Sequence, residues 1–188
     1  MRLGYHTSGL QNHRLDAALA LLAQNRYEAV AITPDVCHLD PDATDDRTLD
    51  DCGRRLADLG LRPVMETGAR FVLDPGTKHE PTLMTRDRGG RDRRIAFYRR
   101  VAAMGRRLGA EVVSFWAGVD RAPGPDSDDR LVDGVARACA AIRDEGLRPS
   151  LEPEPGMAVE TVADWVRLRA RLGAAAPALT LDVGHLYA

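Results

Sequence analysis

The chain alternates between two patterns of apolar positions. Short apolar runs, such as Glu-Ala-Val-Ala-Ile-Thr at 28–33 and Glu-Val-Val-Ser-Phe-Trp at 111–116, are typical of β-strands. Between such runs apolar residues recur every three or four positions, as at Leu15, Leu19 and Leu22, which predicts amphipathic helices. The pattern predicts strands at residues 2–6, 28–33, 62–67, 111–116, 148–152 and 178–182, and helices at 15–25, 49–60, 91–108, 126–144 and 161–172.

Six strands that alternate with five helices, without consecutive hairpins, predict a parallel sheet with right-handed crossovers. An open nucleotide-binding sheet would need a glycine-rich turn after the first strand, and residues 6–11 (His-Thr-Ser-Gly-Leu-Gln) contain no G-x-G-x-x-G. The strands start about 35 residues apart, so eight units would need about 260 residues, close to the typical barrel length of about 250. We therefore predict one α/β domain over residues 1–188, which forms six of the eight units of a β/α (TIM-type) barrel and lacks the last two.

The last predicted strand carries informative polar residues. The run Ala-Leu-Thr-Leu-Asp-Val at 178–183 has the pattern of a strand buried on both faces. Asp182 stands where this strand leaves the sheet, and His185 falls in the loop that follows.

A second run with the same arrangement lies about 30 residues earlier, where Pro-Ser-Leu-Glu-Pro-Glu at 149–154 also ends in carboxylates. Because the carboxyl ends of parallel strands open on one side of the sheet, we expect Glu152 and Asp182 to meet there, with His185 beside them. Carboxylate oxygens and an imidazole are suitable ligands for a divalent cation. Carboxylates at strand ends also serve as helix caps, so a purely structural role of these acids is the alternative to a metal site.

Composition and charge describe a soluble globular protein, with 44% hydrophobic and 29% charged residues. A formal charge of −2 gives no general reason to expect nucleic acid or a membrane surface as a partner. No apolar run approaches the length of about 18 residues that spans a bilayer, and we expect no signal peptide. Cys37, Cys52 and Cys139 are widely spaced, as in a cytoplasmic protein with reduced thiols.

Two motifs resemble a known family. Leu-Glu-Pro-Glu-Pro-Gly at 151–156 and Leu-Thr-Leu-Asp-Val-Gly-His at 179–185 are similar to segments of the xylose-isomerase-like superfamily of sugar isomerases, epimerases and inosose dehydratases. The segments at 30–38 and 112–118 are similar as well. The resemblance implies an eight-fold barrel that holds a divalent metal ion through Glu, Asp, His and Glu from its last four strands.

The resemblance assigns roles to residues of this chain. Glu152 matches the first metal ligand and Asp182 the second, whereas His185 matches a histidine that contacts a substrate oxygen in the epimerases. The ligands from strands seven and eight have no counterpart, so this chain alone is expected to bind metal weakly. The identity of the ion (Mn, Mg, Co or Zn) stays open.

The implied activity is a metal-dependent sugar or sugar-phosphate isomerase or epimerase that transfers a proton through an enediolate. Glu152 would move the proton, and His185 would donate a hydrogen bond to the developing oxyanion. The cation would act as a Lewis acid. A chain without the last two units could also be inactive.

Other residues are expected at the same edge of the sheet. His6 ends the first strand, and Trp116 ends the fourth, where it could cover the apolar face of a sugar or belong to the core. Glu154 competes with Glu152 as a ligand and could contact substrate. His79 lies in a long loop at 68–90, where a surface position is the simpler interpretation.

Two alternative functions stay open. Endonuclease IV, a three-zinc DNA-repair enzyme, needs histidines from the third and fourth strands, but those positions read Met65-Glu66-Thr67 and Phe115-Trp116-Ala117. The other alternative is a non-catalytic barrel fragment or binding subunit, whose exposed last strand would favour a homo-oligomer. The arginine-rich stretch at 86–107 could hold phosphate or nucleic acid, although such stretches are usually solvated helix faces.

Overall fold

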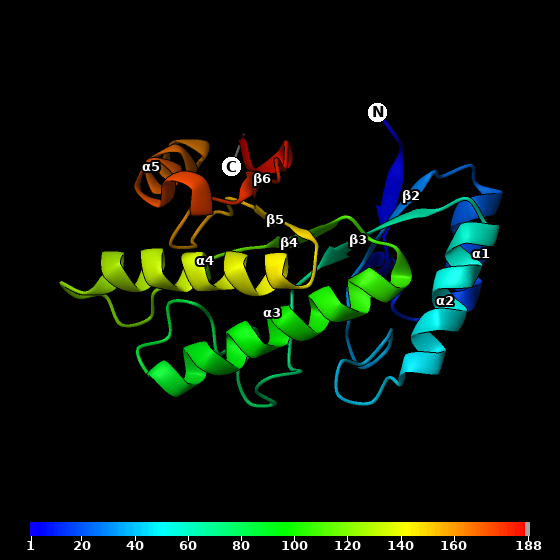
Figure 1. Cartoon of the computed structure of the whole chain (residues 1–188), viewed down its shortest axis with the longest axis horizontal. Helices are drawn as coiled ribbons and strands as arrows, with labels where there is room; N and C mark the ends of the chain where they lie inside the picture. Colours follow the sequence, from blue (N-terminus) through cyan, green and yellow to red (C-terminus); the bar gives the residue numbers. More distant parts are fainter. Residues whose placement is uncertain (187–188) are drawn as a thin grey trace.

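The computed structural model describes residues 1–186, which form one six-stranded parallel sheet with helices between the strands (Figure 1). The strands lie in sequence order, and each pairs in parallel with the next. They are β1 (Gly4–His6), β2 (Ala29–Ile32), β3 (Arg62–Glu66), β4 (Val112–Phe115), β5 (Arg148–Leu151) and β6 (Ala178–Leu179). The helices are α1 (Leu15–Gln24), α2 (Asp46–Asp58), α3 (Arg88–Leu108), α4 (Ser127–Asp144) and α5 (Val162–Leu172). This order is that of six consecutive β/α units of a barrel, as predicted.

Polar side chains at the helix ends set several of these boundaries. The Asp87 side chain accepts a hydrogen bond from the Gly90 amide, so α3 begins three residues earlier than the apolar pattern predicts. The same helix ends at Gly109, whose φ of 79° is left-handed and suits glycine. Thr161 and Asp164 form a reciprocal capping box at the start of α5.

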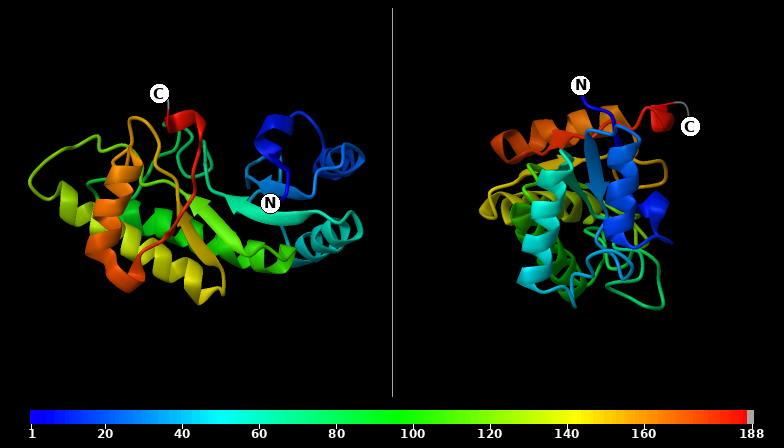
Figure 2. Two further views of the ribbon diagram at one scale, coloured as in Figure 1. Left: turned by 90° about the horizontal axis from the view of Figure 1, so that it is seen from above. Right: turned by 90° about the vertical axis from the view of Figure 1, so that its right-hand side faces the viewer.

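The two faces of the sheet differ in burial. The face toward the helices carries Val30, Ile32, Met65, Val113 and Phe115, which are almost completely buried. The residues between them on the same strands, including Ala31, Val64 and Ser114, are only half-buried. Since α3 and α4 lie along one side of the middle strands (Figure 1) and the helices stand outside the curved sheet (Figure 2), the half-buried face is the interior of the barrel.

The prediction that residues 178–183 form a strand buried on both faces is wrong. β6 contains two residues, and the side chains of Leu181 and Val183 beyond it are 51% and 61% exposed. The physical reason is position: within residues 1–186, β6 pairs only with β5 and is an edge of the sheet. The other edge, β1, also exposes apolar residues, Leu3 and Tyr5.

Four arginines of the stretch at 86–107 pair with acids of neighbouring elements, among them Arg100 with Asp42, whereas Arg94 is completely buried. Arg99 contacts Asp144, Arg106 contacts Glu145, and Arg107 contacts both Asp46 and Asp50. These pairs lie on the solvated outer surface of α3. They agree with the interpretation of the stretch as a solvated helix face, rather than as a site for phosphate or nucleic acid. Among the described residues, no helix is both long and apolar enough to cross a membrane.

Two matched substitutions test the difference between the faces. Val113→Ala removes methyl groups from a fully buried site and should lower the free energy of unfolding by about 2 kcal/mol. Val64→Ala, the same change on the half-buried face, should cost less than about 1 kcal/mol. Urea unfolding measures both values, and equal losses would contradict the proposed orientation of the sheet.

Candidate functional site

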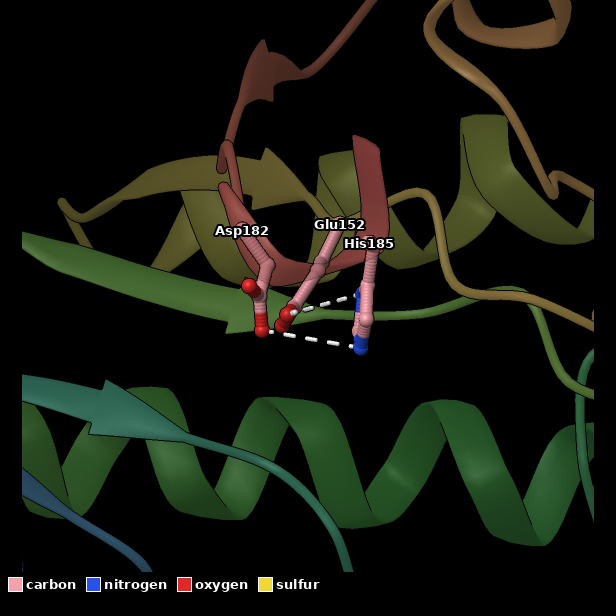
Figure 3. Close-up of side chains that lie close together, drawn as sticks. All are labelled: Glu152, Asp182 and His185. Carbon is pink, nitrogen blue, oxygen red and sulfur yellow. Dashed lines mark ion pairs between the residues drawn. The ribbon is translucent and has the colours of Figure 1, made fainter. Parts of the chain in front are cut away.

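Three side chains from two adjacent strand ends converge. Glu152 directly follows β5, whereas Asp182 and His185 follow β6, and one ligand atom from each lies within 4.8 Å of the other two. His185 Nε2 lies 3.5 Å from Asp182 Oδ2, and His185 Nδ1 lies 3.9 Å from Glu152 Oε1 (Figure 3). The parallel sheet therefore brings together the three residues for which the sequence predicts a common location.

Backbone hydrogen bonds hold the two acids at these positions. The Glu152 amide donates to the Phe115 carbonyl at 2.9 Å, which continues the β4–β5 pairing to the carboxylate. The Gly184 amide donates to Asp182 Oδ1 at 2.7 Å, so a tight turn orients the second carboxylate. His185 Nδ1 lies 3.3 Å from the Pro153 carbonyl, and Nε2 on the other side of the ring faces Asp182.

The acids are crowded and partly shielded from water. Burial is the main cause that raises the pKa of Glu152 from 4.5 to about 7, and the charges of Glu154, Glu66 and Asp182 add to it. Burial also raises the pKa of Glu154, and His185 opposes the rise in both groups. Because like charges raise each other's pKa, a bound cation would relieve a repulsion that the fold imposes.

The donor set fits a divalent metal ion. Two carboxylates and an imidazole are ligands accepted by Mg²⁺, Mn²⁺ or Zn²⁺. Donors on opposite sides of an octahedral ion at about 2.1 Å are about 4.2 Å apart. The observed spread of 4.8 Å therefore needs only small movements of the side chains. Asp182, with a side chain 43% exposed, is freer to move than Glu152, at 20%.

The sequence matches the model of a known protein family. The model of the xylose isomerase-like TIM barrel family matches residues 19–188. The chain belongs to this family. The resemblance and the β/α-barrel fold predicted from the sequence are thereby confirmed.

Solved structures agree with the family fold. D-psicose 3-epimerase, crystallised in the presence of D-fructose, shares 16% identity with a TM-score of 0.79, over 100% of this chain and 65% of that one. IOLI protein with a binding zinc atom shares 18% at a TM-score of 0.77, over 100% and 65%. A xylose isomerase-like TIM barrel protein from Mycobacterium smegmatis, in complex with magnesium, shares 17% at a TM-score of 0.68, over 98% and 65%.

At these identities the likeness shows the fold, and the chain spans just under two thirds of the length of each of these proteins. A comparison with curated protein sequences finds no match. Solved structures with the same fold thus include an epimerase and zinc- and magnesium-bound proteins.

Glu154 and His6, which were also predicted to belong to the site, lie outside the group of Glu152, Asp182 and His185. Glu154 is half-buried, and its charge acts on Glu152, but it is outside the group of three. His6 is exposed at the end of β1, which three strands separate from β5, and its ring stacks on Tyr5 and contacts Ser8. The roles of both residues stay predictions.

Trp116 and His79 form a packed group beside the strand ends. The His79 ring meets Trp116 edge-on at 5.3 Å between centroids, and the Arg94 guanidinium lies 4.7 Å from the Trp116 ring centroid. Trp116 is only 8% exposed. The expected surface position of His79 is wrong, because the ring is half-buried and its Nδ1 lies 2.5 Å from the Gly68 carbonyl.

Sequence reasoning missed Glu66 and a set of hydroxyl groups. Glu66 is the last residue of β3, and its charge reaches both Glu152 and Glu154. The hydroxyls belong to Ser114, Ser150 and Thr180. The signal for Glu66 was available: an acid at the end of a predicted strand, the same feature that identified Glu152.

A cavity of about 300 Å³ adjoins the site. Asp182 and His185 line it together with Thr161 and Val162 at the start of α5. Glu152 does not line this cavity, although its carboxylate lies beside the other two side chains (Figure 3). Two of the three site residues are therefore accessible from this cavity.

The raised pKa of Glu152 predicts how stability depends on pH in metal-free buffer. Between pH 4.5 and about 7 the unfolded chain releases a proton that the folded chain keeps, so the free energy of unfolding falls as the pH rises. Over this pH range the free energy of unfolding should decrease by at most about 3 kcal/mol. Glu152→Gln should flatten this part of the profile. Exposed Glu111→Gln is the control, and equal profiles for wild type and Glu152→Gln in urea unfolding would refute the burial of this carboxylate.

Proposed function

We propose that this chain carries the metal-binding and proton-transfer part of a sugar isomerase or epimerase. The observation that supports the proposal most strongly is the convergence of Glu152, Asp182 and His185 at adjacent strand ends. The fold is that of a family whose solved members include D-psicose 3-epimerase and metal-bound proteins. A small sugar is therefore the substrate class that fits best.

Glu152 and Asp182 would hold a divalent cation from two directions, with His185 beside them. When bound, such an ion supplies Lewis acidity, which polarises a carbonyl group and stabilises negative charge on its oxygen. The Gly184 amide orients the Asp182 carboxylate, and pairing with β4 fixes the main chain of Glu152, so mainly the Glu152 side chain must become ordered on binding.

Glu152 would move the proton at the carbon next to the sugar carbonyl. Because Glu152 must be ionised to hold the ion, it would accept the proton from that carbon as a general base and then return it. His185 would donate a hydrogen bond to the oxygen on which charge develops as the enediolate forms. Glu154 would contact a hydroxyl of the substrate, and His6 and Trp116 would line the more distant part of the pocket.

A phosphodiesterase of the endonuclease IV type is less well supported. In residues 1–186, Glu152, Asp182 and His185 are the one group of at least three potential metal ligands. The ends of β3 and β4 carry Glu66 and Trp116 in place of histidines. A trinuclear zinc site would need additional ligands at these positions.

Calorimetric titration with Mn²⁺ tests the metal site. Wild type should bind one ion, and Asp182→Asn should weaken binding by more than about tenfold because a charged ligand is lost. Affinity should fall as the pH drops below about 7, since Glu152 must lose its proton to bind. Glu111→Gln, at the opposite end of the sheet, should match wild type. If wild type and Asp182→Asn bound Mn²⁺ with equal affinity, Asp182 would be excluded as a metal ligand.

Solvent exchange tests the proton transfer. With Mn²⁺ and D-fructose in D₂O, the chain should introduce deuterium at the carbon next to the carbonyl, and mass spectrometry or NMR would detect it. Glu152→Gln should lower the exchange rate by at least about 100-fold, because general acid–base catalysis contributes about that much. Exchange that persists in this variant would show that another group moves the proton.

A further inference from the structure

A row of polar side chains crosses the inner face of the sheet below the three site residues. In the strand register, Glu66 of β3 pairs with Ser114 of β4, and Ser114 pairs with Ser150 of β5. The Thr180 hydroxyl completes the row, since Thr180 Oγ1 lies 2.8 Å from Ser114 Oγ and 2.6 Å from Ser150 Oγ. These contacts show that the side chains share one face.

This row lies one step deeper in the barrel than the proposed metal ligands. Glu152 comes two residues after Ser150, and Asp182 two residues after Thr180. Side chains two residues apart on a strand share a face and are separated by about 6.6 Å along it. Glu66 therefore stands at the floor of the site, and the reach of its charge to Glu152 and Glu154 agrees with that position.

The Glu66 carboxylate is oriented but not saturated. Thr33 Oγ1, beyond the end of β2, donates to Glu66 Oε2 at 2.7 Å. Within residues 1–186 this is the one side-chain hydrogen bond that the carboxylate accepts, so Oε1 is available. A half-buried carboxylate oxygen is a strong acceptor for a ligand hydroxyl, because hydrogen bonds to ionised groups are about twice as strong as neutral ones.

We propose that Glu66 determines specificity: its Oε1 accepts a hydrogen bond from a hydroxyl of an uncharged sugar or polyol, at the end of the substrate away from the metal ligands, and thereby disfavours phosphorylated sugars. The inference rests on the proposed function and narrows its substrate class. Thr33 is the positioning residue that holds the carboxylate in place.

The charges around the site agree with an uncharged substrate. The site gathers four carboxylates, and the charges of Glu66 and Asp182 act on both Glu152 and Glu154. The arginines of the adjoining loops are already engaged: Arg70 contacts Asp35, and Arg121 contacts Glu80.

The remaining cations offer little to a phosphate group. Arg94 is completely buried and lies against Trp116 and two other aromatic rings. Lys78, an exposed residue, opposes the raised pKa of Glu154. A phosphate at the floor of the site would thus meet an uncompensated carboxylate, which is an effective way to reject an anionic competitor.

Titration with two named sugars tests the inference. Binding of D-fructose and of D-fructose 6-phosphate is measured by calorimetry, with and without Mn²⁺, for wild type and Glu66→Gln. Wild type should bind D-fructose at least about tenfold more tightly, and Glu66→Gln should reduce this preference by about tenfold. Thr33→Val should give a smaller reduction, and Glu111→Gln none.

The outcomes separate this inference from the proposed function. Mn²⁺ binding should change by less than about threefold in Glu66→Gln, whose folding is checked by circular dichroism. Loss of Mn²⁺ binding in this variant would make Glu66 a metal ligand and overturn its specificity role, with the metal site upheld. The specificity role of Glu66 would also be overturned if wild type and Glu66→Gln had equal affinities for the two sugars, or if wild type bound neither sugar. Failure of wild type to bind Mn²⁺ would instead reject the proposed function.

Discussion

The parallel pairing of β4, β5 and β6 places the carboxylates of Glu152 and Asp182 so close together that their charges interact. Glu152 and Asp182 leave adjacent strands at the same edge of the sheet, where hydrogen bonds hold the main chain of Glu152 and the carboxylate of Asp182. Burial and like charge raise the pKa of Glu152 to about 7, so the arrangement favours a bound cation or proton. The pairing of the strands thus keeps the two carboxylates close together although their charges repel each other.

Stability and chemistry are divided between alternate residues of the same strands. On β4, Val113 and Phe115 face the helices and are buried, whereas Ser114 between them faces the barrel interior and joins the hydroxyl row. The period of two along a strand makes this division possible. Substitutions on the inner face can therefore change which ligand is accepted without removing contacts from the core.

The apolar pattern predicted the element order, the parallel topology and the location of the two acids, because each depends on local periodicity and on a general property of parallel sheets. It failed at residues 178–183, since a pattern does not show that a strand lies at an edge. It also misplaced His79, whose burial depends on a loop with left-handed backbone at Ala69 and His79. Glu66 was missed because a strand-end acid gains meaning only from its neighbours in space.

Anomalous X-ray diffraction from crystals soaked in Mn²⁺ tests the central claim most directly. We expect one strong anomalous peak within about 2.3 Å of carboxylate oxygens from both Glu152 and Asp182. His185 should lie next to the peak. The account would be contradicted by a peak elsewhere in the molecule, or by crystals in which these two carboxylates point to separate sides of the sheet.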